Sequence, residues 1–207
     1  MAIVGRTTVR CPSCDRETEC QLTQSINART EPDAKARLLA GELNTLACAC
    51  GRRSQLAVTV LFRDPDADYW CQVCPGGEVA MAEGEAAFRS AGTGGTQRLV
   101  PSQNALIEKL KLVDAQLEDW AIEMNKVLLL ASREDRDLER VLLFDRADDD
   151  RIHWALFEDD GVRAMASPRA AYARLAARIS GRPAMGEYRI DRAWAMEAVR
   201  KMIAEAN

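Results

Sequence analysis

Two short cysteine motifs hold the residues of this sequence that are best suited to chemistry. Cys11 and Cys14 are separated by two residues, a spacing that lets both thiolates bind one tetrahedral ion from a tight turn. The backbone amides within such a turn point at the sulfurs and stabilise their charge. Cys48 and Cys50 supply a second pair, and Gly51 can adopt the positive φ that suits the residue after the last ligand. The sequence therefore predicts a metal site of four sulfurs.

The distribution of the cysteines favours a metal site over disulfide bonds. All 7 cysteines lie within residues 11–74, and the chain after them has none. A cytoplasmic chain keeps its thiols reduced, so metal binding is preferred to a disulfide. Two alternatives stay open. One is a site completed by Cys20 or Cys74, and the other is a lost site whose cysteines serve as small buried hydrophobic residues.

Two other candidates for chemistry are interpreted as structural residues. Cys71 and Cys74 have the spacing of a thioredoxin-type redox motif, but they lie in a predicted strand, and residues 75–77 (Pro-Gly-Gly) exclude a helix that would lower the pKa of the first thiol. His153 is the only histidine, which excludes the two-histidine motifs of metalloproteases. We expect His153 to be a sheet residue without a catalytic role, and the sequence indicates no other catalytic residue.

Charge and hydropathy restrict the partners of this chain. With 28 Lys and Arg against 32 Asp and Glu, the net charge is −4, which provides no broad basic surface for nucleic acid. Four arginines near the cysteine motifs could contact phosphate, but neutralising the charge of the thiolates is the simpler role: Arg6, Arg10, Arg52 and Arg53. The apolar stretches are too short for a membrane span, and residues 1–10 lack the apolar region of a secretory signal. We therefore expect a cytoplasmic protein.

The elements that must position the cysteines are short strands. Residues 1–76 predict strands at 7–10, 18–26, 56–62 and 69–73, with one helix inserted from Thr30, as its N-cap, to Gly41. Residues 77–101 are enriched in Gly, Ala and Ser and predict a linker with one short helix.

Residues 102–207 predict helices followed by a small α+β part. Apolar residues from Leu106 to Val127 recur at helical spacing, which fits one long helix or two helices broken near Asp114–Gln116, with the stripe packed on its own domain. Strands are expected at 141–144 and 152–157, and helices at 167–179 and after Asp191. The predicted fold class is α+β in two parts.

At the level of motifs, the sequence resembles the bacterial CpXC-domain proteins, a functionally uncharacterised family. The resemblance spans residues 9–130 and rests on these segments: Val9-Arg10-Cys11-Pro12-Ser13-Cys14, Ile26-Asn27-Ala28, Leu38-Leu39-Ala40-Gly41-Glu42-Leu43-Asn44, Cys50-Gly51, Leu61-Phe62-Arg63-Asp64-Pro65 and Val73-Cys74-Pro75, with a weaker continuation in residues 104–109 and 122–126. It implies a zinc-ribbon-like N-terminal domain whose two Cys-Pro-x-Cys motifs form zinc knuckles. This chain departs from the pattern at Asp15, where the family usually has Gly, and at the second motif, where Ala47 holds the first cysteine position and Cys48 lies one residue late.

Three functions follow as expectations. The first is a non-catalytic module or accessory subunit, stabilised by structural Zn²⁺ on Cys11, Cys14, Cys48 and Cys50, that binds a protein partner through the exposed side of the helical stripe or the hairpin at residues 56–75. The second is an enzyme or enzyme subunit with its site in residues 131–207. The third is a nucleic-acid-binding zinc ribbon. The sequence indicates no oligomeric state.

Overall fold

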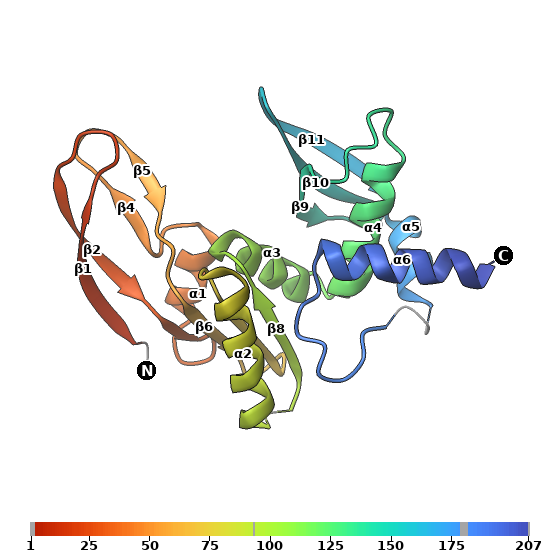
Figure 1. Cartoon of the computed structure of the whole chain (residues 1–207), viewed down its shortest axis with the longest axis horizontal. Helices are drawn as coiled ribbons and strands as arrows, with labels where there is room; N and C mark the ends of the chain where they lie inside the picture. The colour runs from red at the N-terminus through yellow and green to blue at the C-terminus, as the bar shows by residue number, and fades with distance from the viewer. Residues whose placement is uncertain (1–2, 93, 179–181, 207) are drawn as a thin grey trace. The chain divides into compact units, whose positions relative to one another are not determined.

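The computed structural model describes residues 3–92, 94–178 and 182–206. The chain divides into two compact units, unit 1 (residues 1–107) and unit 2 (residues 108–207). Both units mix helices and strands (Figure 1), which confirms the α+β class. Among the described residues, every helix is too short or too polar to cross a membrane.

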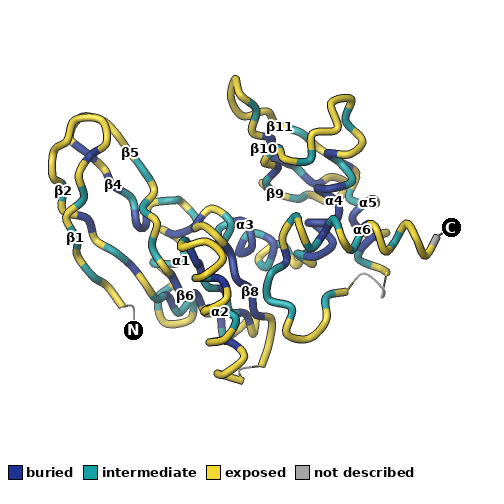
Figure 2. The backbone as a smooth tube through the Cα atoms, viewed as in Figure 1, coloured by how far each residue is buried: buried dark blue, intermediate teal, exposed yellow. Residues whose placement is uncertain are grey.

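Two separate β-hairpins carry the cysteine motifs of unit 1. In the first hairpin β1 (Val4–Arg10) pairs antiparallel with β2 (Glu17–Thr23), and in the second β4 (Thr45–Ala47) pairs with β5 (Arg53–Gln55). Most residues of β1 and β2 are exposed or intermediate (Figure 2), because each short hairpin has little to pack against. Burial increases only where the hairpins meet, around Cys20 and Leu46.

A four-stranded mixed sheet forms the core of unit 1. Its order is β3-β6-β7-β8, from β3 (Ser25–Asn27), β6 (Val60–Asp64), β7 (Tyr69–Val73) and β8 (Thr96–Val100). The β6–β7 pair is antiparallel, and the Asp64 carboxylate accepts bonds from the Asp66 and Ala67 amides in its turn, 3.1 and 3.3 Å long. The outer pairs are parallel, so each needs a crossover connection. The second cysteine hairpin lies in the β3–β6 crossover, next to α1 (Pro32–Leu39).

The segment predicted as a linker with one short helix, residues 77–101, instead forms the 15-residue α2 (Gly77–Ala91) and β8. The helix starts directly after Pro75-Gly76, so the expectation that no helix can begin there is wrong. Gly76 acts as the N-cap, and proline before a helix ends a strand without preventing the helix. A glycine lets α2 lie close to the sheet: a Cβ on Gly84 would lie 3.0 Å from a methyl group of Leu99 and 3.1 Å from the Cys74 sulfur.

Unit 2 packs helices against one face of a three-stranded antiparallel sheet. The sheet order is β11-β10-β9, from β9 (Val141–Ala147), β10 (Arg151–Glu158) and β11 (Gly161–Pro168). The helices are α3 (Gln103–Asp114), in which the boundary between the units falls, α4 (Asp119–Ala131), α5 (Arg169–Ala176) and α6 (Arg192–Ala206). The core joins the inner faces of β9 and β10 to α4, α5 and α6, and α4 is buried along most of its length (Figure 2).

The helical stripe is broken into two helices and is buried. Residues 115–118 separate α3 from α4, as in the second of the two predicted arrangements. Leu117, Trp120, Met124 and Val127 belong to the core of unit 2, so the expectation that the stripe packs on its own domain is confirmed. The stripe is therefore not available as a contact surface.

Several elements differ from the sequence prediction. The strand expected at 56–62 begins only at Val60, and the N-cap of α1 is Glu31 rather than Thr30. The strand β11 was not expected, because alanine, arginine and methionine favour strands weakly. The helix expected at 167–179 therefore starts two residues later, at Arg169, and the end of that prediction lies outside the described residues.

A buried network of ion pairs connects the elements of unit 2. Lys126 lies 2.8 Å from Glu108 and 3.0 Å from Glu123, and Lys109 lies 2.9 Å from Asp119 and 3.4 Å from Glu123. Lys109 also donates to the carbonyl of Ile190, and Oε1 of Glu108, the oxygen 2.8 Å from Lys126, also accepts the backbone amide of Phe144. The network thus joins α3 and α4 to β9 and to the segment before α6.

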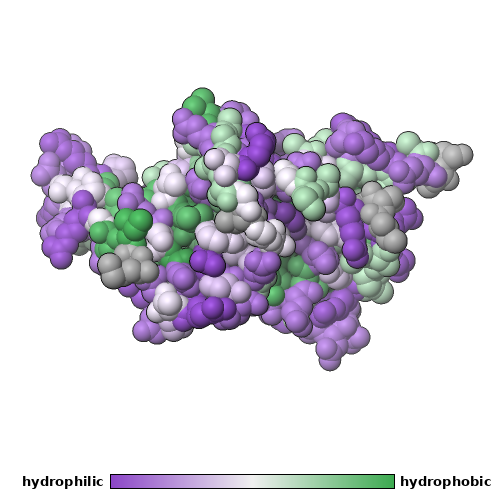
Figure 3. Space-filling view, turned by 90° about the horizontal axis from the view of Figure 1, so that it is seen from below, coloured by the Kyte–Doolittle hydropathy of each residue, from purple (hydrophilic) through white to green (hydrophobic). Residues whose placement is uncertain are grey.

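Exposed apolar side chains are few. The large ones with substantial exposure are Ile3, Val4, Val79, Val141, Phe157, Val162, Met185 and Ile203. On the face drawn in Figure 3, hydrophilic side chains predominate and apolar ones form small separate patches.

Candidate metal centre

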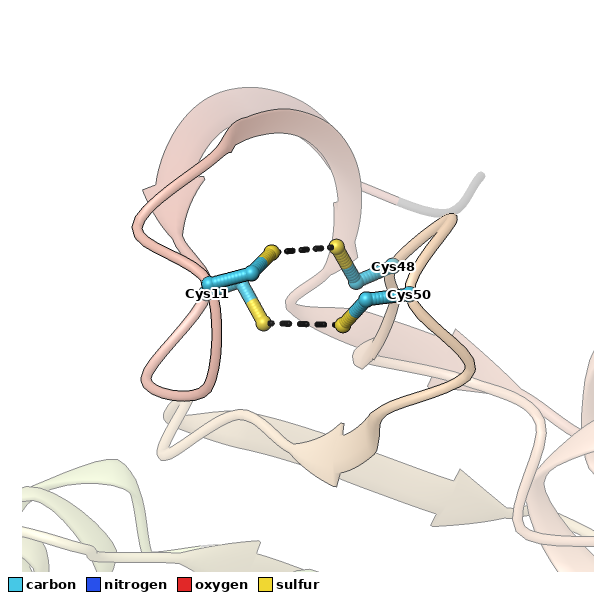
Figure 4. Close-up of side chains that lie close together, drawn as sticks. Cys11, Cys48 and Cys50 are labelled. Atoms are coloured by element: carbon cyan, nitrogen blue, oxygen red, sulfur yellow. Dashed lines mark hydrogen bonds between the residues drawn. The ribbon is translucent and has the colours of Figure 1, made fainter.

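The tips of the two hairpins of unit 1 carry the four cysteines. β1 ends at Arg10 and β2 begins at Glu17, so Cys11 and Cys14 lie in the first tip. β4 ends at Ala47 and β5 begins at Arg53, so Cys48 and Cys50 lie in the second. The tips face each other, with the labelled sulfur-bearing side chains pointing inward between them (Figure 4).

The four sulfur atoms lie at the spacing of a tetrahedral metal site. All lie within 4.8 Å of one another, with Cys11 and Cys50 3.7 Å apart and Cys14 and Cys48 3.6 Å apart. A zinc–sulfur bond of about 2.3 Å requires tetrahedron edges of about 3.8 Å. The donor set and its geometry therefore fit one metal ion, and these four residues are the cluster predicted from the sequence.

Similar backbone turns hold both pairs. In the first tip the amide of Cys11 donates to the Arg16 carbonyl over 3.0 Å, and the amide of Asp15 donates to the Cys11 carbonyl over 2.9 Å. In the second tip Cys48 donates to the Arg52 carbonyl and accepts from the amide of Gly51, both over 2.9 Å. The Cys-x-Cys motif thus closes a turn despite lacking one residue between its cysteines.

The residue after each pair has a left-handed backbone. Asp15 has a φ of 58° and Gly51 has a φ of 88°. A glycine takes this conformation without strain, whereas aspartate is one of the few other residues that tolerate it. The departure from glycine at Asp15 therefore leaves the turn intact.

Burial divides the four cysteines into two kinds. Cys11 is fully buried and Cys48 is 7% exposed, whereas Cys14 and Cys50 are exposed. The buried two pack with Cys20, Leu46 and their apolar neighbours in a small cluster beneath the tips. One side of the sulfur cluster is therefore shielded from water and the other is open to solvent.

Electrostatics at the sulfurs favour an anion at Cys48. The pKa of its thiol is lowered to about 6, first by the backbone amide of Cys50, then by hydrogen bonds from the three other thiols, against desolvation. The pKa of Cys14 is raised to about 11: the Arg16 amide lowers it, but the bonds with Cys50 and Cys48 and desolvation raise it more. Without an ion the cluster thus stabilises one thiolate, and a bound cation would replace the protons of the other thiols.

An asparagine that sequence analysis did not identify holds the two hairpins together. Asn44, 2% exposed, lies just before β4, and its side chain pairs with both backbone groups of Thr23 at the end of β2, over 2.7 and 3.0 Å. Its amide also donates to Gln103. The φ of Asn44 is 52°, a left-handed conformation that asparagine tolerates well. The residue type was the signal for this position that the sequence offered.

The remaining cysteines lie apart from this cluster. The Cys20 sulfur contacts the Thr18 carbonyl at 3.7 Å, and Cys74 lies beneath α2, where a Cβ on Gly84 would meet its sulfur. Cys71 and Cys74 are 0% and 1% exposed, on or just after β7. All three are therefore buried packing residues, and an accessible redox pair is not formed.

The other candidate groups have ordinary surface partners. His153 lies in β10, as predicted, 2.7 Å from the Asp148 carboxylate and 3.4 Å from Arg146. Hydrogen bonds from His153 and from the Arg151 amide lower the pKa of Asp148 to about 2. These contacts form an exposed charged cluster on one hairpin.

The arginines near the tips do not surround the thiols as expected. Arg6 pairs with Glu19 at 3.4 Å and Arg10 with Glu17 at 3.2 Å, each across the first hairpin. Arg52 bonds to the Ser54 hydroxyl. Backbone amides rather than guanidinium groups therefore stabilise the charge of the sulfurs.

Comparison with known families places this site in context. The model of the CpXC protein family matches residues 9–126, which is more than half of the chain. The chain belongs to the CpXC family. The matched region begins at the end of β1 and contains both cysteine tips, the second hairpin, the four-stranded sheet, α3 and the first part of α4, and it ends before β9. Searches of curated proteins and of solved structures gave no match.

Proposed function

We propose that this CpXC protein binds one structural Zn²⁺ through Cys11, Cys14, Cys48 and Cys50, and that it acts as a non-catalytic interaction module. The observation that carries the proposal is the approach of four sulfurs from two hairpins to within 4.8 Å. Four thiolate ligands are typical of structural zinc sites. When bound, zinc would supply charge neutralisation and a cross-link between the hairpins.

The coordination chemistry argues for a structural role. Four sulfurs complete a tetrahedron, so no coordination position is left for water or substrate. The two hairpins have little core of their own, and a structural ion typically supplies about 10–16 kcal/mol of apparent binding energy to such a region. Reduced thiols are maintained in the cytoplasm, where we place the protein.

Residues 56–59, just before β6, are the part of the predicted contact hairpin 56–75 that we assign to a partner protein. The helical stripe is buried, and β6 and β7 are the mostly buried central strands of the sheet, whereas residues 56–59 alternate between exposed and intermediate burial. A nucleic-acid role gains no support, because Arg6 and Arg10 are in ion pairs with glutamates, which removes half of the small basic patch.

Elemental analysis of the purified protein tests the metal site. We expect about one equivalent of zinc in the native chain, as for a four-thiolate site, and its loss in Cys11→Ser and in Cys48→Ser. Cys20→Ser is the matched control, because Cys20 is 4% exposed in the same apolar cluster but is not among the four close sulfurs. Zinc retained in Cys48→Ser, or lost in Cys20→Ser, contradicts the assigned ligand set.

A second experiment tests the role of the module. The tagged chain is purified from its own cells with its partner, and the same purification is repeated with Cys11→Ser and Cys20→Ser. We expect the partner to be lost with the first variant and kept with the second. A substrate turned over by the isolated chain, at a rate abolished by one substitution, would refute the non-catalytic assignment.

A further inference from the structure

The strand β11 presents a free edge to solvent in unit 2. It pairs with β10 on one side, and the sheet order places no described strand on the other. The amide of Arg169 donates to the Asp150 carbonyl, which makes Asp150 and Arg169 a hydrogen-bonded pair of the antiparallel ladder. In an antiparallel ladder, hydrogen-bonded and non-hydrogen-bonded pairs alternate. Val162, Ala164 and Ala166 therefore belong to non-hydrogen-bonded pairs with β10, and their amides and carbonyls point away from it.

The outward groups of β11 have no partner within the described part of the chain. No hydrogen bond joins the amides or carbonyls of Val162, Ala164 and Ala166 to another described residue. All three residues are exposed, so no described helix or loop buries this strand. An edge of this length with no lysine, bulge or internal proline is a template for a further strand.

The opposite edge of the same sheet, strand β9, is protected against pairing with a further strand. The register between β9 and β10 shifts at His153 and Trp154, a bulge that bends the outer strand. The outward amide of Phe144 is bonded to the buried carboxylate of Glu108. Arg192 also donates to the carbonyl of Arg140, just before β9. The fold therefore blocks strand addition at β9 and leaves it open at β11.

Exposed charged groups lie at the two ends of the free edge. The β10–β11 turn carries Asp159 and Asp160, both exposed, and neither forms an ion pair with a described residue. At the other end, Arg151 is exposed opposite Pro168, and the guanidinium of Arg169 donates to the Asp148 carbonyl in the β9–β10 turn, which also carries the exposed Asp149 and Asp150. An antiparallel copy of the same strand would place Asp159 and Asp160 beside Arg151 and Arg169.

We propose that β11 pairs antiparallel with β11 of a second copy of this chain, about a two-fold axis at Ala164. In this register Ala164 lies opposite Ala164 of the second copy, and Val162 lies opposite Ala166, so every outward amide of these residues meets a carbonyl. The acidic turn then lies beside Arg151 and Arg169 of the second copy. Such an interface is isologous and closes as a dimer, and it joins the two sheets into one. It uses unit 2 alone and does not depend on the metal centre.

The outer face of the joined sheet adds an apolar contribution. Phe157 is flanked by Val141 and Val162 on the neighbouring strands, and the three side chains are 43%, 47% and 61% exposed. In the dimer Val162 gains a neighbour in Ala166 of the second copy, which covers part of this row. An interface built on one strand pair is small, so we expect a Kd of roughly 1 µM to 1 mM.

Sedimentation velocity across this concentration range tests the dimer. We expect a monomer–dimer equilibrium that Ala164→Pro weakens at least tenfold, because proline removes the amide at the symmetry axis and no bond to β10 is lost. Asp160→Lys and Arg151→Glu should each weaken the dimer at low salt, and their combination should restore it. Glu205→Lys makes the same charge change on the exposed end of α6 and should have no effect. A chain that stays monomeric, or a dimer insensitive to Ala164→Pro and to the charge variants, overturns the proposal and leaves the edge to a strand of another protein.

Single cysteine substitutions test the register. Opposite residues of a hydrogen-bonded pair have Cα atoms about 5.5 Å apart, which a disulfide can span. With oxidised glutathione, Ala164→Cys should therefore give a covalent dimer above the wild-type background. Val162→Cys and Ala166→Cys should do so only when the two variants are mixed. A covalent dimer from Val162→Cys alone would contradict the register and the proposed axis.

Discussion

Replacing Lys126 by methionine removes the positive charge shared by two buried carboxylates in unit 2. Lys126 is 10% exposed at its side chain and lies 2.8 Å from Glu108 and 3.0 Å from Glu123, which are 6% and 9% exposed. Methionine fills similar space without the charge. Glu123 keeps Lys109 at 3.4 Å, whereas Glu108 loses its ion pair and keeps the bond from the Phe144 amide and the longer-range attraction of Lys109.

The expected loss of stability follows from the burial of this pair. Breaking one partner of a buried ion pair costs about 3–5 kcal/mol, because the remaining charge stays desolvated. Lys111→Met is the matched control: Lys111 lies 3.3 Å from Asp145, but these side chains are 36% and 52% exposed. An exposed pair of this kind contributes about 0–1 kcal/mol. The two substitutions remove the same charge from helices of the same unit and should therefore differ severalfold in effect.

The loss should also depend on pH. Desolvation raises the pKa of Glu123, but Lys126 and Lys109 lower it more, so its folded-state pKa lies below the ordinary value. The network therefore contributes stability above the unfolded pKa of about 4.3, and this contribution disappears as the pH falls through the folded pKa. In Lys126→Met the Glu123 carboxylate can bind a proton on acidification, so the difference between variant and wild type should shrink towards low pH.

Urea unfolding followed by tryptophan fluorescence measures these effects, because Trp120 and Trp154 are both buried in the core of unit 2. We expect the free energy of unfolding to fall by about 3–5 kcal/mol at pH 7 in Lys126→Met and by under about 1 kcal/mol in Lys111→Met. Equal losses in the two variants, or a loss that does not change between pH 7 and pH 4, would refute the assignment of the network as a charged core.

Three further predictions concern other parts of the chain. Gly84→Ala should destabilise unit 1 by about 1–3 kcal/mol in thermal unfolding, since its methyl group would lie 3.0 Å from Leu99; an unchanged melting temperature would contradict the close approach of α2. Asn44→Ala should cost about 1–3 kcal/mol in urea unfolding, because it leaves buried backbone groups at the end of β2 unpaired, whereas a neutral effect would mean that water replaces the side chain. His153→Ala should raise the pKa of Asp148 from about 2 towards its ordinary 3.8 in an NMR titration, and a pKa that stays near 2 would assign the shift to backbone bonds.

The cluster of four cysteines could be predicted from the sequence because its signal is local. Two cysteine pairs, each within a turn, and a glycine after the second pair specify hairpin tips almost independently of the remaining fold. Their meeting in space could not be derived in the same way. It depends on Asn44, whose contacts with Thr23 span 21 residues, and on apolar contacts of Cys20 and Leu46 beneath the tips.

The segment after β7 shows why other predictions were wrong. Glycine and alanine between residues 76 and 95 were interpreted as a linker, yet small residues are what a helix needs to lie closely on a sheet, as at Gly84. The strand β11 was missed for a related reason: alanine and arginine carry little strand preference, and the strand forms because β10 provides a ladder for it. In both segments, tertiary contacts rather than residue preferences determine the secondary structure.

The separation of the two cysteine pairs along the chain has a kinetic consequence. Cys14 and Cys48 lie 34 residues apart, and β2, β3, α1 and β4 all fall between them. Closing a loop of that size costs the unfolded chain about 4 kcal/mol of conformational entropy. An ion bound by one cysteine pair would therefore be coordinated by the second pair only after the intervening elements have folded. The rate at which a refolding chain completes its metal site would then report loop closure rather than the diffusion of the ion.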